Sequence, residues 1–243
     1  MLKVCKFGGS SVAGAEQFRK VRDIVLSDDS RRVVVISAAG KRTSDDHKLT
    51  DLLYLCHAHL TYGVSCADIL AAIRSRFVSI RDELGLSYRV EDEFDAYAAT
   101  LSRDTSVDEL VSRGEYFTAR LMAETLGYAF VDAADCVFFG FDGQFDRART
   151  DAAIAAALEK NARIVLPGFY GRVPTGKIKV MTRGGSDITG ALAAAAVNAD
   201  VYENWTDVSG ILMADPRIVE NPRPIPRITY AELREMAFMG ASV

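Results

Sequence analysis

The chain has 243 residues, of which 49% are hydrophobic and 26% are charged, and its net charge is −4. This apolar content is enough for one sizeable core, and the acidic balance does not fit a nucleic-acid-binding protein, which is usually basic. No stretch approaches the roughly 18 apolar residues that span a membrane, and the N-terminus lacks a signal-peptide pattern. We therefore expect a cytoplasmic protein with neither nucleic-acid nor membrane partners.

The N-terminal segment predicts a parallel sheet. Residues 2–7 form a short apolar strand pattern that a glycine pair ends, and a helical pattern follows over about 13–26. Residues 32–37 contain Val33-Val34-Val35-Ile36, a continuous β-branched run. Such a run is typical of a strand that is covered on both faces. Strand, glycine turn, helix and strand together make a βαβ unit.

The middle of the chain predicts a mainly helical region from Thr50 to Gly127. Its apolar residues recur at spacings near 3.6, and Gly85 and Gly127 are predicted helix ends. This region is also a candidate surface for self-association into a homo-oligomer. Short strands are predicted at 128–131 and 137–139.

The remaining chain again alternates helices and strands. Glu232 lies three residues after Thr229, which matches a capping box at the start of the last helix. The chain stops at Val243 soon afterwards, so we expect a fragment of a longer protein. The predicted helices lie at 151–160, at about 182–198 and from 229, and the predicted strands lie at 164–166, 177–181 and 200–205.

The first candidate site is the sequence Lys6-Phe7-Gly8-Gly9-Ser10. Glycines between a strand and a helix let the backbone approach a ligand, and the helix N-terminus favours an anion. The Lys6 ammonium at the strand end can reach the same anion. A tight glycine turn beside a surface lysine is the competing interpretation. The segment is not a Walker A loop, because no Gly-Lys-Ser/Thr follows at the required spacing.

A second glycine pair stands in Arg183-Gly184-Gly185-Ser186-Asp187, again before a predicted helix. Ser186 or Asp187 is the expected N-cap, and Arg183 can hold a carboxylate with two parallel hydrogen bonds. Asp187 is costly near an anion unless a cation pairs with it, so we expect it to position Lys6 or another basic group. Simple capping beside a surface arginine is the alternative.

The third candidate is Ser112-Arg113-Gly114-Glu115, which lies inside a helical pattern. Glycine there costs about 1 kcal/mol relative to alanine, and that cost favours a packing or ligand reason. Glu115 suits a substrate ammonium. An exposed Arg-Glu face is the competing interpretation.

The fourth candidate follows the last predicted strand, at Trp205-Thr206-Asp207-Val208 and Ala214-Asp215-Pro216-Arg217. Open α/β sheets place ligands beyond the carboxyl ends of their strands. Thr206 and Asp207 could contact a base or ribose, and Arg217 could contact a phosphate. An Asx-type turn with a loop arginine would show the same pattern.

Taken together and in this order, the four segments resemble the aspartate kinases of the amino-acid kinase superfamily over nearly the whole chain. The resemblance implies a three-layer α/β/α sandwich with a mostly parallel, eight-stranded central sheet. It also implies one catalytic domain over 1–243, with a substrate lobe over about 1–170 and a C-terminally incomplete nucleotide lobe over about 171–243. The ACT regulatory domains of full aspartate kinases are expected to be absent from this chain.

The implied reaction transfers the γ-phosphoryl group of ATP to the side-chain carboxylate of L-aspartate, with Mg²⁺, as the first step towards lysine, threonine and methionine. Asp187 would orient the catalytic Lys6, and no protein metal site is predicted. The implied aspartate contacts are Thr50, Glu115, Arg183 and Ser186, and the implied ATP contacts are Lys6, Phe7, Gly8, Gly9, Ser10, Thr206, Asp207, Asp215 and Arg217.

Two points stay open at this stage. The family often carries a lysine within 240–243 that contacts ATP, where this chain has Ser242, so either another cation replaces it or nucleotide binding is weaker. The alternative functions are kinases of glutamate, acetylglutamate, carbamate or UMP, and a non-catalytic ligand-binding module.

Overall fold

The runs of β-branched residues form a parallel sheet in the computed structural model, which describes residues 1–182, 184–207, 210–215 and 218–238. Its strands lie in the order β3-β4-β2-β1-β7, and every neighbouring pair is parallel. This confirms the expected mostly parallel sheet. The strands are β1 (Lys3–Phe7), β2 (Arg31–Ile36), β3 (Ala129–Phe130), β4 (Ile164–Pro167) and β7 (Val201–Trp205).

The described residues place five strands in this sheet, whereas the resemblance implies eight. β5 (Tyr170–Arg172) and β6 (Ile178–Val180) pair antiparallel with each other instead, because the connection between them is too short for a parallel crossover. Residues 137–139, predicted as a strand, form only isolated bridges from Phe138 to Arg172 and from Phe139 to Phe145.

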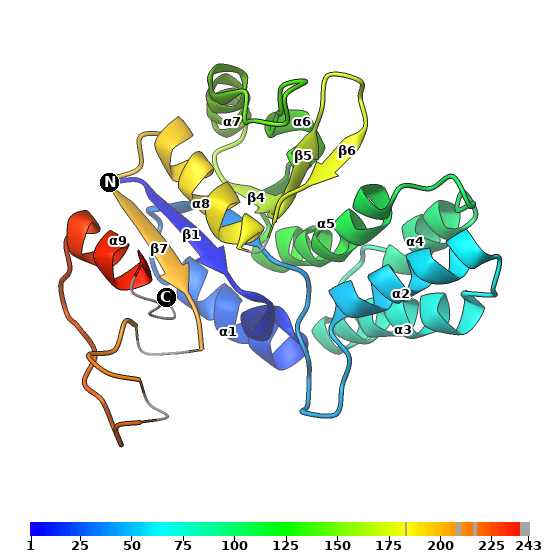
Figure 1. Ribbon diagram of the computed structural model, residues 1–243, viewed down its shortest axis with the longest axis horizontal. Helices are drawn as coiled ribbons and strands as arrows, with labels where there is room; N and C mark the ends of the chain where they lie inside the picture. The colour runs from blue at the N-terminus through cyan, green and yellow to red at the C-terminus, as the bar shows by residue number, and fades with distance from the viewer. Residues whose placement is uncertain (183, 208–209, 216–217, 239–243) are drawn as a thin grey trace. The chain divides into compact units, whose positions relative to one another are not determined.

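Helices cover both faces of the sheet, and α1 and α8 lie on opposite sides of β1 (Figure 1). The glycine pair of the first motif leads into a short 3-10 helix, η1 (Gly9–Val12). The helices are α1 (Ala15–Leu26), α2 (Leu49–Tyr62), α3 (Ala67–Leu84), α4 (Val90–Ala98), α5 (Val107–Leu126), α6 (Ala133–Cys136), α7 (Arg147–Lys160), α8 (Gly185–Ala196) and α9 (Tyr230–Phe238).

Alternation along the strands explains the three layers, because successive side chains point to opposite faces. Val34 and Ile36 pack into one core with α1 to α5, while Val33 and Val35 pack into a second core with α6, α7 and α8. The predicted α/β/α sandwich is therefore confirmed. α3 ends at Gly85 and α5 at Gly127, each in the left-handed region at φ 67°, which confirms the predicted helix ends.

The chain divides into two compact units, Met1–Trp205 and Thr206–Val243. The lobe boundary expected near residue 170 falls inside the first unit, between β4 and β5, and the later strand β7 still pairs with β1. The assignment of substrates to lobes stays a prediction.

In the second unit, the backbone N–H and Oγ1 of Thr229 donate to Glu232 Oε2 at 2.8 and 2.7 Å, and the Glu232 N–H donates back to Thr229 Oγ1 at 3.3 Å. The predicted capping box of α9 is therefore present. Among the described residues, no helix is long and apolar enough to cross a membrane.

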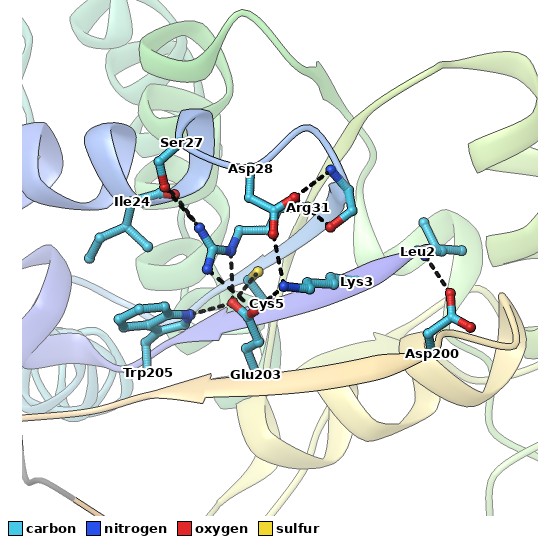
Figure 2. Close-up of polar contacts among 11 residues, drawn as sticks. Leu2, Lys3, Cys5, Ile24, Ser27, Asp28, Arg31, Asp200, Glu203 and Trp205 are labelled. Atoms are coloured by element: carbon cyan, nitrogen blue, oxygen red, sulfur yellow. Dashed lines mark hydrogen bonds and ion pairs between the residues drawn. The ribbon is translucent and has the colours of Figure 1, made fainter.

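The strand β7 is fastened to the sheet by a carboxylate at the centre of Figure 2. Glu203 accepts hydrogen bonds from Arg31 Nε at 2.8 Å and from Trp205 Nε1 at 2.9 Å. Lys3 Nζ lies 3.3 Å from it, and Cys5 Sγ donates to it at 3.4 Å. These contacts join β1, β2 and β7, so one side chain ties three strands together.

The charge state of Glu203 follows from the same contacts. Burial raises the pKa of Glu203, but hydrogen bonds from Arg31, Trp205, Cys5 and Lys3 outweigh burial and hold it below its usual value. A carboxyl group with a depressed folded pKa adds stability that is present above its unfolded pKa and is lost as the pH falls through the folded pKa.

We expect Glu203→Gln to lower the free energy of unfolding at neutral pH by about 1–3 kcal/mol, because Arg31 and Lys3 lose their shared counter-charge. The difference in unfolding free energy between the variant and the wild type should disappear at acidic pH, where the wild-type carboxyl group also becomes protonated. Urea denaturation at several pH values measures both effects. Glu16→Gln removes an exposed carboxylate that pairs with Lys20 and should change stability little; an equal loss in the two variants would contradict the prediction.

Candidate active site

The site is organised around Lys6, which is only 7% exposed at the carboxyl end of β1. Its Nζ lies 2.9 Å from Oδ1 of Asp187, on the first turn of α8. A Cβ built on Gly8 would lie 3.6 Å from this Nζ, so the ammonium lies beside the glycine turn. The interpretation of Lys6 as a surface lysine is therefore wrong, and the predicted contact with Asp187 is present.

Asn204 joins this pair, although the sequence motifs did not single it out. It lies opposite Lys6 in the parallel register of β1 and β7, and its Nδ2 donates to Asp187 Oδ1 at 2.9 Å. One carboxylate oxygen thus accepts from an ammonium and from an amide. Its place at the carboxyl end of a strand, directly before Trp205-Thr206-Asp207, was the available signal.

The start of α8 differs from the expectation in one respect. Neither Ser186 nor Asp187 is the N-cap, because Gly184 occupies that position at φ 79°, where glycine carries no steric penalty. Asp187 is therefore inside the helix, and its carboxylate faces Lys6 instead of the helix amides. Ser186 is 8% exposed, and a Cβ on Gly168 would come within 2.7 Å of its Oγ. The end of β4 thus packs closely on this turn.

The glycine turn is held by a second backbone segment, which follows β2. The Gly40 N–H donates to the Gly9 carbonyl oxygen at 2.8 Å. A Cβ on Gly40 would lie 2.6 Å from Gly9 C and O, and a Cβ on Gly9 would lie 2.9 Å from the Ala38 oxygen. Both positions therefore need glycine because the two backbones touch. Sequence reasoning found Gly9 but missed Gly40, whose partner is distant along the chain.

Glu115 is a buried carboxyl group that forms no ion pair within the described residues. It is 5% exposed on α5, and its Oε2 has no hydrogen-bond partner within the described residues. Burial raises the pKa of Glu115 to about 8, and a hydrogen bond from the Ala38 backbone lowers it only in part. Such a group suits an incoming cation. The interpretation of this segment as an exposed Arg-Glu face is therefore wrong.

Ala38 lies between Glu115 and the glycine turn. Its backbone lowers the pKa of the Glu115 carboxyl group, its oxygen would lie 2.9 Å from a Cβ on Gly9, and its Cβ would lie 3.0 Å from a Cβ on Gly114. The close contact between Ala38 and Gly114 is a packing reason for a glycine inside this helix, as the sequence predicted. A short stretch of backbone thus places an unpaired carboxyl group near a turn that carries an ammonium.

The remaining residues that were predicted to contact aspartate or ATP differ in burial and in location along the chain. Thr50 is half-buried in the first turn of α2, and Ser10 is exposed in η1. The Phe7 side chain stacks on Trp205 in the core, with ring centroids 5.9 Å apart, so only its backbone can serve the site. Thr206, Asp207 and Asp215 belong to the second unit. Predictions that lie outside the described residues concern Arg183, Arg217 and Ser242.

The described residues contain no group of three or more His, Cys, Asp and Glu side chains that could hold a metal ion. Mg²⁺ in kinase sites is bound mainly by substrate phosphates and water, with one or two carboxylates. The residues present therefore fit Mg²⁺ that arrives with a nucleotide.

The fold and site define an α/β protein with a glycine turn and a buried lysine at the carboxyl ends of parallel strands. The particular family follows from comparison with known proteins. The model of the amino acid kinase family matches residues 1–243, and the chain belongs to that family.

The relatives it resembles are aspartokinases. The chain is 34% identical to aspartokinase 3 of Bacillus subtilis over 256 residues, which cover 100% of this chain and 56% of that protein. Its fold matches the crystal structure of Clostridium acetobutylicum aspartate kinase with a TM-score of 0.92 and 44% identity, over 98% of this chain and 55% of that one.

A third match is Escherichia coli aspartokinase III in complex with aspartate and ADP, with a TM-score of 0.82 and 32% identity over 99% of this chain and 57% of that one. The chain thus spans about half the length of the relatives it matches.

Replacing Glu115 by Gln should make stability less dependent on pH. The folded state keeps the Glu115 proton up to about pH 8, whereas the unfolded state releases it near pH 4.3. The wild type therefore loses stability as the pH rises through this window. We expect Glu115→Gln to match the wild type near pH 4.5 and to be more stable by a few kcal/mol at pH 8.

Urea denaturation at both pH values measures this gap. Glu159→Gln, at an exposed position of α7, controls for the loss of one negative charge. A wild type and a Glu115→Gln variant with parallel pH profiles would contradict the assignment.

Proposed function

We propose that this chain is the catalytic region of an aspartate kinase, which transfers the γ-phosphoryl group of ATP to the side-chain carboxylate of L-aspartate and forms 4-phospho-L-aspartate. The observation that carries the proposal is the buried Glu115, whose Oε2 has no partner within the described residues and which lies near Ala38, a residue that also packs on the Lys6–Gly9 turn. An amino-acid substrate carries an ammonium group that would bind beside Glu115. It also carries a carboxylate that would react at the Lys6–Gly9 turn. The resemblance to aspartokinases supports the same substrate.

Binding of the amino acid would begin at Glu115. A substrate ammonium placed beside this carboxyl group favours its ionised form and lowers its pKa, so binding compensates a charge that is costly to bury alone. The other predicted substrate contacts are Thr50, Arg183 and Ser186. This arrangement leaves the side-chain carboxylate of aspartate as the nucleophile.

The transfer step needs positioning and charge stabilisation more than proton transfer. The aspartate side chain is ionised at neutral pH, with an unperturbed pKa near ~3.9, so no general base is required. Lys6 would stabilise the charge on the equatorial phosphoryl oxygens, while Asp187 and Asn204 hold its ammonium in place.

The backbone of Gly8 and Gly9 allows close approach of the phosphate, because neither residue has a side chain. Mg²⁺, when bound with ATP, supplies further neutralisation of phosphate charge. Thr206, Asp207 and Asp215, together with Arg217, remain predicted nucleotide contacts. A role in the synthesis of lysine, threonine and methionine, a homo-oligomeric state and a cytoplasmic location also remain predictions.

The substrate assignment is tested by ADP formation with MgATP and each of L-aspartate, L-glutamate, acetylglutamate, carbamate and UMP. We expect turnover with aspartate only. Thermal shifts with Mg-ADP and the same panel report binding without turnover, because a ligand that binds the native state raises its melting temperature. A shift with aspartate and no ADP would favour a binding module, and turnover with another substrate alone would overturn the proposal.

The roles within the site predict two different kinetic defects. Lys6→Ala should lower kcat by about 10²–10³-fold with a smaller effect on KM, because Lys6 acts on charge that develops in the transition state. Glu115→Gln should instead raise the KM for aspartate by about tenfold or more, because a charge-assisted contact with the ammonium is lost.

Lys20→Ala is the matched control, since this lysine is exposed on α1 and forms an ion pair with Glu16 on the same helix. Its kinetics should equal those of the wild type. An unchanged kcat in Lys6→Ala, or an unchanged aspartate KM in Glu115→Gln, would remove that residue from the proposed mechanism.

A further inference from the structure

Arg76 is a charged residue buried among apolar side chains. It lies on α3 beside the core residues Ile73, Phe77 and Ile80, and only 4% of it is exposed. Its Nε has no hydrogen-bond partner within the described residues, and burial lowers the pKa of its guanidinium. An apolar residue of similar volume often serves stability as well as a buried ion does. Stability alone therefore does not explain an arginine here.

Within the described residues, the Arg76 guanidinium donates its hydrogen bonds to one segment, residues 40–47. This segment belongs to the connection between β2 and α2 and has no regular structure. Nη1 donates to the carbonyl oxygen of His47 at 2.8 Å, and Nη2 donates to that of Gly40. The carboxylate of Asp46, in the same segment, lies 3.6 Å from Nη2 and is shared with Arg42, whose Nε lies 2.9 Å from it. One rigid, planar guanidinium thus holds both ends of the segment at a fixed separation.

The Gly40 end of the segment reaches the glycine turn. While the Gly40 carbonyl accepts from Arg76, its N–H donates to the Gly9 oxygen at 2.8 Å. The two backbones are in close contact at this point, since a Cβ on Gly40 would lie only 2.6 Å from Gly9 backbone atoms. Displacement of Gly40 would therefore move Gly9, which directly follows Gly8, and a Cβ built on Gly8 would lie 3.6 Å from the Lys6 Nζ.

The His47 end leads directly into α2, which begins at Leu49. Leu49 is fully buried, and Thr50 follows it in the first turn. The same guanidinium therefore also limits where the predicted aspartate contact Thr50 can lie. Arg76 is connected in this way to both halves of the proposed reaction.

We propose that Arg76 is a positioning residue, which fixes the glycine turn through Gly40 and the start of α2 through His47. The inference rests on the proposed phosphoryl transfer for its kinetic consequence, but its structural link can be measured without activity. Arg76 itself is not assigned a contact with substrate.

Amide hydrogen exchange tests the link directly. We expect Arg76→Met to accelerate exchange of the Gly40 amide by tenfold or more, because the residue that holds its peptide in place is lost while the side-chain volume is kept. Arg74→Met is the matched control on the same helix, where Arg74 is more exposed and pairs with Asp95. It should leave the Gly40 amide unchanged, and equal exchange in the two variants would overturn the inference.

Kinetics then separate positioning from mere support of the fold. With MgATP and aspartate, we expect Arg76→Met to lower kcat at least tenfold and to raise the aspartate KM, at a melting temperature close to that of Arg74→Met. Arg76→Lys, which keeps the charge and one of the two hydrogen bonds, should recover part of both. Faster exchange with kcat within twofold of the control would show a purely structural role and overturn the proposal.

Two other outcomes remain interpretable. If Arg76→Met fails to fold, Arg76→Lys supplies the exchange and kinetic comparisons, and a wild-type Gly40 amide together with wild-type kinetics would overturn the inference. If the wild-type protein forms no ADP with aspartate, the proposed function fails, and the exchange contrast alone decides whether Arg76 holds Gly40.

Discussion

The arrangement of this site depends on burying an ammonium at the end of a central strand. β1 lies between β2 and β7, so its side chains alternate between two covered faces. Cys5 and Phe7 enter the core on the α1 side, whereas Lys6 faces α8 and meets Asp187 at 2.9 Å. An ammonium in this position would be costly without a partner. The pairing of β7 with β1 and the packing of α8 are therefore prerequisites for the site, because they bring Asn204 and Asp187 to it.

Buried polar groups among the described residues differ in how completely their hydrogen bonds are satisfied. On the α1 side, Glu203 receives several donors and ties three strands together. Around the glycine turn, by contrast, Glu115 Oε2 and Arg76 Nε are buried and have no partner within the described residues. Buried polar groups are usually hydrogen-bonded, and exceptions concentrate where a ligand or a functional constraint supplies the reason.

The backbone between β2 and α2 links these elements. Ala38 touches the glycine turn and Glu115, and Gly40 touches Gly9 and Arg76. A connection of this kind transmits small displacements, because the contact between Gly9 and Gly40 is backbone to backbone and leaves no room for a side chain. The position of the phosphate-binding turn thus depends on α3 and α5 as well as on its own strand and helix.

Local sequence patterns were sufficient to predict much of the local structure and part of the site. Short apolar and β-branched runs located most strands, glycines marked the ends of α3 and α5, and Thr229 with Glu232 identified the start of α9. The charge argument also predicted that Asp187 pairs with Lys6 or another basic group, because an isolated carboxylate beside an anion site is unfavourable, and the structure shows that the partner is Lys6. These features depend on residues that are close in the chain or on a pair whose motifs are recognisable separately.

Contacts between segments that are distant in the sequence could be identified only in the folded chain. It placed Asn204 beside Asp187, Gly40 against Gly9 and Arg76 on the segment 40–47, and it made Gly184 the N-cap in place of Ser186 or Asp187. It also left β5 and β6 outside the central sheet. None of these contacts has a local pattern, because each arises from strand order and helix packing. Those are set by the burial of whole faces, not by the residues that finally touch.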